Sequence, residues 1–145
     1  RDSKTGHGER MCQSSAIAMR IEQIDPAIIG DDDSYLEIVQ RFGDTVSQAA
    51  HQKALSSLGL SHRFRQDGTE DILCDLLDQG IAVPIGILHK GPIDAPTGGG
   101  HWVTLIGYDE RFFHVHDPFG ELNLIRGGYD LTGPKSDGWL WDIRK

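Results

Sequence analysis

The spacing of apolar residues changes near residue 80. Before that point apolar side chains recur every three or four residues, and Ile17, Ile21 and Ile24 share one face of a predicted helix. Acidic or hydroxyl residues precede such segments and glycine or proline follows them, as at helix ends. Helices are therefore predicted over 12–24, 34–42 and 47–58 and between Thr69 and Gly80, with a short strand over 60–66.

After residue 80 the pattern predicts strands. Runs rich in β-branched and aromatic residues occupy 81–88, 101–109, 112–120, 121–125 and 138–144. Residues 109–111 predict a hairpin between two of these runs. Pro84 lacks a backbone N–H, so we expect its strand at a sheet edge or a bulge. Helices followed by antiparallel strands predict the α+β class, with one domain over 1–145.

Polar residues at the predicted helix starts have two possible roles. Thr45 is the predicted cap of the helix over 47–58. Asp31, Asp32 and Asp33 precede the second helix, where carboxylates accept backbone N–H groups and favour the positive end of the helix dipole. A metal site is the alternative for these three acids, although their spacing matches no calcium loop.

Composition excludes several classes of function. The 145 residues carry 14 basic against 22 acidic side chains, a net charge of −8, which disfavours binding to nucleic acid. The chain has no apolar run as long as a membrane span, and we expect a soluble monomer. Two cysteines are too few for a disulfide scaffold. Residues 1–10 lack both an initiator Met and an apolar signal core, so we expect a trimmed piece of a longer protein.

Cys12 is the first candidate for chemistry. It begins a predicted helix after a polar loop, where unpaired N–H groups and the helix dipole favour a thiolate, the nucleophilic form of cysteine. The alternative is a small residue that packs at a helix start. Cys74 lies in the middle of a helix beside Asp75 and Asp78, and burial with acidic neighbours would suppress its thiolate. We therefore interpret Cys74 as a packing residue.

His101 and Asp117 are the candidate partners of a nucleophile. His101 follows three glycines, which permit close approach of a substrate backbone, and it begins an apolar strand. Asp117 ends the strand that follows the predicted hairpin. Two antiparallel strands joined by a short turn bring their outer ends together, so His101 and Asp117 should be neighbours. A structural histidine and a strand-terminating Asp-Pro turn are the alternatives.

The remaining histidines offer one competing chemistry. His51 and His62 have polar neighbours and are interpreted as surface residues. His114 and His116 share a strand face, and with Asp117 and a further ligand such as His101 or Asp109 they could bind zinc. The sequence contains no HExxH motif and no paired-cysteine spacing, so no metal or other cofactor is predicted.

The order Cys12, His101, Asp117 resembles that of papain-like cysteine peptidases. Residues 1–19, "RDSKTGHGERMCQSSAIAM", and 98–121, "GGGHWVTLIGYDERFFHVHDPFGE", are similar to the nucleophile and His/Asp regions of bacteriocin-processing, double-glycine-leader peptidases. Residues 117–130, "DPFGELNLIRGGYD", resemble forms of that domain in bacteriophage lysins and virion proteins.

The resemblance implies a papain-like fold in which N-terminal helices pack on a C-terminal antiparallel sheet. It makes Cys12 the nucleophile, His101 the general base and acid, and Asp117 the residue that orients the imidazole. Members of the group usually carry a Gln before the Cys as an oxyanion donor, and residues 1–11 contain none. If Arg1 and Asp2 match the entry segment of the family, this Gln would immediately precede residue 1. Otherwise Lys4, His7 and Gln13 are the candidate donors, beside the backbone N–H of Cys12.

The expected activity is hydrolysis of peptide or amide bonds. Gly99, Gly100 and Trp102 flank His101 and are predicted, with Gln13, to contact substrate or the oxyanion. The phage-like segment indicates a peptidoglycan cross-link as substrate and action on the bacterial cell wall. Processing of a leader peptide is the second enzymatic hypothesis, and a catalytically impaired binding module of the same fold is the third.

Overall fold

The computed structural model describes residues 12–45, 47–65, 70–87, 101–110, 113–117, 124–125 and 140–145. Within these residues the chain forms helices and strands in the order α1 (Cys12–Ile24), α2 (Asp32–Gln40), α3 (Gln48–Ser57), β1 (Ser61–Arg65), α4 (Glu70–Asp78), β2 (Val83–Ile87), β3 (His101–Tyr108), β4 (Phe113–His116), β5 (Leu124–Ile125) and β6 (Leu140–Arg144). The α+β class is confirmed, and α1 has the predicted bounds.

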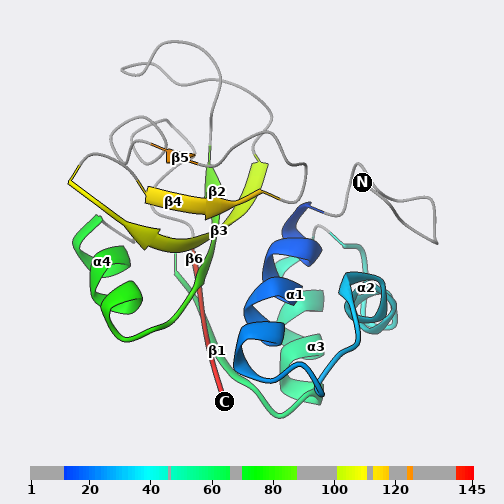
Figure 1. The fold of residues 1–145 in the computed structure, drawn as a ribbon. Coiled ribbons are helices and arrows are strands. Elements are labelled where there is room, and N and C mark those ends of the chain that lie inside the picture. Colours follow the sequence, from blue (N-terminus) through cyan, green and yellow to red (C-terminus); the bar gives the residue numbers. More distant parts are fainter. Residues whose placement is uncertain are drawn as a thin grey trace.

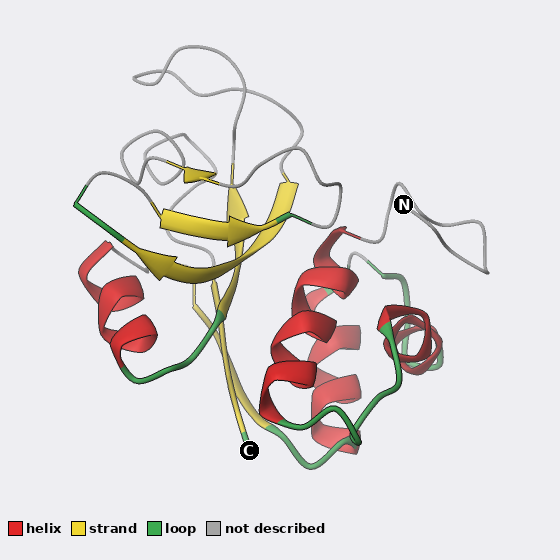
Figure 2. Ribbon diagram, viewed as in Figure 1, coloured by secondary structure: helices red, strands yellow, loops and turns green. Residues whose placement is uncertain are grey.

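The six strands form one antiparallel sheet in the order β1-β6-β2-β3-β4-β5. Helices α1, α2 and α3 lie together on one side of it, and α4 lies on the other (Figure 1). Figure 2 shows the sheet as the layer between these two groups of helices. The last described strand, β6, lies between β1 and β2. It therefore joins the helical half of the molecule, which contains α1, α2, α3 and β1, to the hairpin half, which contains α4 and β2 to β5.

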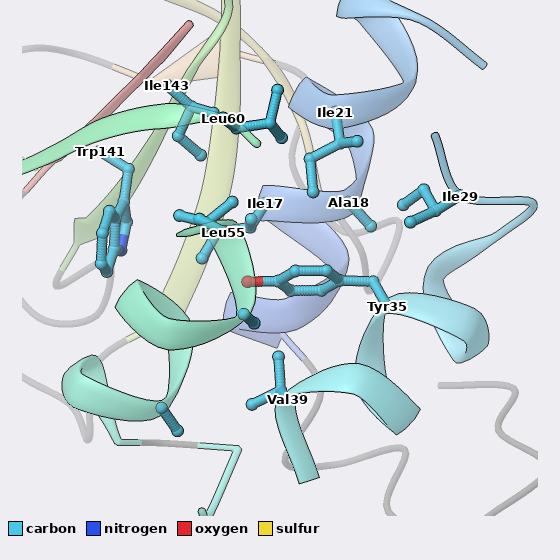
Figure 3. Packing of buried hydrophobic residues seen from close by; sticks show 12 residues of the cluster. Ile17, Ala18, Ile21, Ile29, Tyr35, Val39, Leu55, Leu60, Trp141 and Ile143 are labelled. Atoms are coloured by element: carbon cyan, nitrogen blue, oxygen red, sulfur yellow. The ribbon is translucent and has the colours of Figure 1, made fainter. Parts of the chain in front are cut away.

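Each face of the sheet has its own hydrophobic cluster. On the face of α1–α3, Trp141 and Ile143 of β6 pack against side chains from all three helices (Figure 3). On the opposite face, Leu73 and Leu76 of α4 pack against β2, β3 and β4. Adjacent strand residues such as Leu140 and Trp141 belong to different clusters because side chains alternate across a sheet.

The helix caps confirm one prediction and correct another. Asp31 caps α2, its Oδ1 accepting the backbone N–H of Ser34 at 2.8 Å. The cap of α3 is Ser47, whose Oγ accepts from the N–H of Ala50, so the prediction of Thr45 was wrong. Thr45 is buried, and its carbonyl is an acceptor for the ring of His51.

The prediction that Pro84 lies at a sheet edge or a bulge was wrong. Its strand β2 is an interior strand, and its register with β3 is continuous from Val83↔Leu105 to Ile87↔His101. Among the residues described, the ladder between β2 and β6 has one pair, Ile85↔Leu140. Within the described part of the sheet Pro84 has no paired residue in β6, so its missing N–H is tolerated on that side.

His51 is buried, so its interpretation as a surface residue was wrong. Its ring is 0% exposed and stacks on Tyr35, with ring centroids 5.7 Å apart. Nε2 lies 2.7 Å from the carbonyl of Thr45, an acceptor, so Nε2 carries the proton. Nδ1 then accepts the hydroxyl of Tyr35 at 2.8 Å. Burial lowers the pKa of His51 from 6.5 to about 4, so the imidazole stays neutral in the core.

Candidate active site

Cys12 is the first residue of α1 and is half-buried. As a first-turn residue it lies beside backbone N–H groups that have no partner within the helix. The helix is anchored toward its other end by Arg20, a buried residue whose Nε donates to the carbonyl of Ile143 in β6 at 3.0 Å. Cys12 is therefore presented by a helix that is fixed against the sheet.

His101 and Asp117 come from neighbouring strands, β3 and β4. The pairs Thr104↔His116 and Leu105↔Val115 set the register, and a bulge at Ile106 separates them from the pairs nearer the turn. The outer ends of the hairpin thus bring the two residues together, as the sequence predicts.

A buried hydrogen bond joins His101 to Asp117. Nε2 of His101 lies 2.6 Å from Oδ1 of Asp117, and the two side chains are 4% and 1% exposed. A carboxylate at this distance accepts the Nε2 proton, which fixes the orientation of the ring and leaves Nδ1 as the nitrogen for a further partner. Little solvent reaches the pair to compete for its hydrogen bond.

Cys12 lies close enough to His101 to influence the charge of its imidazole. Burial by itself lowers the pKa of His101, because it disfavours the imidazolium. The interactions of His101 with Cys12 and with Asp117 outweigh burial and raise the pKa of His101 above its usual 6.5. Asp117 and Cys12 together therefore favour an imidazolium at His101.

The other residues predicted to bind substrate are placed as follows. Gln13 is buried in α1, and its Nε2 donates to Oε1 of Gln48 at 2.5 Å. Trp102 is half-buried on the α1 side of the sheet, where it packs near Phe64. Gly99 and Gly100, like Lys4 and His7, lie outside the described residues. A role of any of these residues in binding stays a prediction.

A surface cavity of about 360 Å³ lies between α1, α2 and the end of β4. Ser15, one turn after Cys12, and His116, the neighbour of Asp117, both line it. Its remaining lining comes from Ala18, Met19, Glu22, Asp31 and Asp32. Asp32 accepts the hydroxyl of Ser15 at 2.9 Å and is thus part of the wall between α1 and α2.

The alternative chemistries receive little support from the described part of the chain. His114 pairs with Asp109 at 2.9 Å in an exposed position, and no group of three or more His, Cys, Asp or Glu residues could hold a metal ion among the residues described. Burial and the charges of Asp78, Glu70, Asp71 and Asp75 raise the pKa of Cys74, as expected for a packing residue. No described helix is both long and apolar enough to cross a membrane.

One residue near the site carried no sequence signal. Thr104 is buried in β3, and its Oγ1 donates to the carbonyl of Ala16 in α1 at 2.8 Å. A threonine in an apolar strand is common, since its branched side chain suits a sheet. Only its partner, 88 residues away in the chain, distinguishes it.

The fold is similar to that of known peptidase structures. The structure is similar to that of a Bacillus anthracis protein described as a C39-like peptidase, with a TM-score of 0.69 and 13% identity over 94% of this chain and 90% of that one. It is also similar to the peptidase domain of Streptococcus ComA, a bifunctional ABC transporter of a quorum-sensing pathway, with a TM-score of 0.62 and 14% identity over 94% and 92%. No protein-family model and no curated protein matches the sequence. The chain therefore has the α+β fold of C39 cysteine peptidases.

Proposed function

We propose that this protein is a cysteine peptidase in which Cys12 is the nucleophile, His101 the general base and acid, and Asp117 the orienting carboxylate. The observation that carries the proposal is the buried hydrogen bond between His101 and Asp117, beside Cys12, which helps to raise the pKa of His101. A thiol at a helix start with a histidine partner is the usual way to obtain a nucleophilic cysteine. The likeness to two C39-type peptidase structures supports the same reading.

The proposed reaction has two steps. His101 takes the proton of Cys12, and the sulfur attacks the substrate carbonyl to form a C–S bond. The C–N bond then breaks as His101 gives its proton to the leaving amine, which leaves a thioester. Water attacks this thioester and gives a proton to His101, the C–S bond breaks, and the thiol is restored. Asp117 holds the imidazole in the required tautomer and stabilises its charged form.

The oxyanion formed in each step needs hydrogen-bond donors. The backbone N–H of Cys12 belongs to the first turn of α1, where N–H groups lack helical partners, and is one proposed donor. Gln13 is the proposed side-chain donor among the described residues, and it would have to turn from Gln48 toward the site. Lys4 and His7 are the other candidates from the sequence.

Two substrate classes follow from different observations. The resemblance of 117–130 to segments of phage lysins supports a peptide cross-link of peptidoglycan as the substrate. The likeness to the ComA peptidase domain favours the second candidate, a leader peptide. Both are peptide bonds cleaved by the same chemistry, so the site residues are common to the two proposals.

The test uses both substrates with the same variants. We expect the protein to release muropeptides from purified cell walls. A synthetic double-glycine-leader peptide is the competing substrate, and mass spectrometry detects the products of both assays. Cys12→Ala and His101→Ala should each abolish cleavage while circular dichroism stays unchanged, and Cys74→Ser should retain it. Full cleavage by Cys12→Ala would overturn the proposed peptidase. Failure of wild-type protein on both substrates would favour the binding module.

A further inference from the structure

The hydrogen bond between Thr104 and Ala16 connects the two elements that carry the reactive groups. Oγ1 of Thr104 in β3 donates to the carbonyl oxygen of Ala16 in α1 at 2.8 Å, and both residues are 0% exposed. The Ala16 carbonyl lies inside α1, and its second lone pair is available beyond the helical hydrogen bond. This bond therefore adds a fixed point between helix and strand without breaking the helix.

The hydrogen bond between Thr104 and Ala16 is separated from Cys12 and from His101 only by short stretches of helix and strand. Ala16 follows Cys12 by four residues, about 6 Å along the helix axis. Thr104 follows His101 by three residues, about 10 Å along the strand. The hydrogen bond closes a short loop of rigid structure that contains the contact between Cys12 and His101. A small slide of α1 along β3 would change that contact directly.

A hydroxyl at this position is informative because a valine has almost the same shape. Burying a hydroxyl is costly unless it finds a partner, and valine would avoid that cost in an apolar sheet. The surrounding packing, which includes Ile17 and Trp102, is apolar and has no preferred direction. A hydrogen bond depends on angle and distance, so it can fix a helix position that apolar contacts leave free.

The second anchor of α1 shows why the first is needed. Arg20 ties the later part of the helix to the carbonyl of Ile143 in β6. Gln13 and Ser15, nearer to Cys12, bond to α3 and α2 rather than to the sheet. Thr104 holds the helix one turn from Cys12, on the strand that begins with His101.

We propose that Thr104 is a positioning residue that holds Cys12 at the right distance from His101. The inference rests on the proposed function of this pair. It assigns to Thr104 no contact with substrate, only control over the geometry of the two groups that react.

The test measures the reactivity of Cys12 with iodoacetamide, which requires no knowledge of the substrate. In a Cys74→Ser background, Cys12 is the single thiol, since the chain contains two cysteines. We expect Thr104→Val to slow alkylation about 10-fold at pH 6, because a displacement well below 1 Å is enough to weaken the contact with His101. Rates of the two proteins should converge above pH 9, where the thiolate forms without help from His101.

Three further variants separate positioning from loss of stability. Thr104→Ser keeps the hydroxyl and should restore the wild-type pH profile. Tyr35→Phe removes a buried hydrogen bond to His51 in the helical half, and it should lower the melting temperature without changing the profile. If Thr104→Val does not fold, Thr104→Ser is compared with Thr104→Ala, which differ by the hydroxyl alone.

His101→Ala distinguishes failure of this inference from failure of the proposed function. If His101→Ala leaves the alkylation profile of Cys12 unchanged, then the pair is not coupled and the proposed function itself fails. If His101→Ala changes the profile and a folded Thr104→Val does not, only the positioning role is wrong. Equal profiles for Thr104→Ser and Thr104→Ala would overturn it in the same way.

Discussion

Replacing His51 with glutamine should remove a large part of the acid sensitivity of the fold. The imidazole is buried between the hydroxyl of Tyr35 and the carbonyl of Thr45, and it stacks on the ring of Tyr35. Trp141 is its other aromatic neighbour, with centroids 6.3 Å apart. None of these groups carries a negative charge that could stabilise an imidazolium. Protonation of His51 must therefore be disfavoured in the folded protein.

The size of the effect follows from the pKa. Burial lowers the pKa of His51 from 6.5 to about 4. The unfolded chain binds this proton below pH 6.5 and the folded protein does not until about pH 4, so stability is lost as the pH falls through this window. The difference in pKa corresponds to a loss of about 2 kcal/mol at pH 5 and about 3 kcal/mol at pH 4, relative to neutral pH.

Urea unfolding at several pH values measures this loss. The fluorescence of Trp141, which is fully buried, should report the transition. His101 acts in the opposite sense, because its raised pKa gives stability that is present below pH 6.5 and is lost as the pH rises through the folded value. The difference between wild type and His51→Gln therefore isolates His51. Glutamine offers one donor and one acceptor to the same partners.

A matched variant completes the experiment. His62 lies partly exposed in β1, so His62→Gln should leave the pH dependence close to that of wild type. If His51→Gln shows the same decrease in unfolding free energy from pH 7 to pH 4 as wild type, then the buried imidazole does not control it. That result would refute the reasoning from burial.

Two other predictions concern the site and its support. Asp117→Asn should lower the pKa of His101, because the hydrogen bond and the charge of Asp117 raise it. The same variant should reduce the rate of peptide cleavage roughly 10²- to 10⁴-fold. An unchanged His101 titration by NMR would contradict this prediction. Arg20→Met should reduce the free energy of unfolding by about 2 kcal/mol, because the carbonyl of Ile143 loses a charged donor. The exposed Lys53→Met serves as its control, with a change within about 0.5 kcal/mol in the same urea assay.

Local signals in the sequence were sufficient to predict most helices and strands and one contact of the candidate site. The helix over 12–24 follows from its apolar spacing, and the adjacency of His101 and Asp117 follows from a hairpin with a short turn. Both depend on residues that are close in sequence. The contact between Cys12 and His101 could not be derived in this way, because it depends on how α1 packs against β3, and it was expected only from a family resemblance.

The wrong predictions for His51 and Pro84 both came from local rules applied to features that tertiary packing determines. His51 was interpreted from its polar neighbours, although Ala50, Ala54 and Leu55 form a buried stripe of α3 that includes it. This stripe was the signal that could have placed His51 inside. Pro84 was assigned to an edge by a rule about strands in general, whereas the pairing between β2 and β6 is a property of the whole sheet.

The position of β6 sets the order in which this molecule can be completed during synthesis. Within the described residues, β1 pairs with β6 alone, and β6 supplies Trp141 and Ile143 to the core of the helical half. Until Leu140–Arg144 have left the ribosome, β1 lacks its neighbour and Arg20 lacks its acceptor. A nascent chain therefore cannot complete the sheet and the core around α1 until these strand residues have left the ribosome.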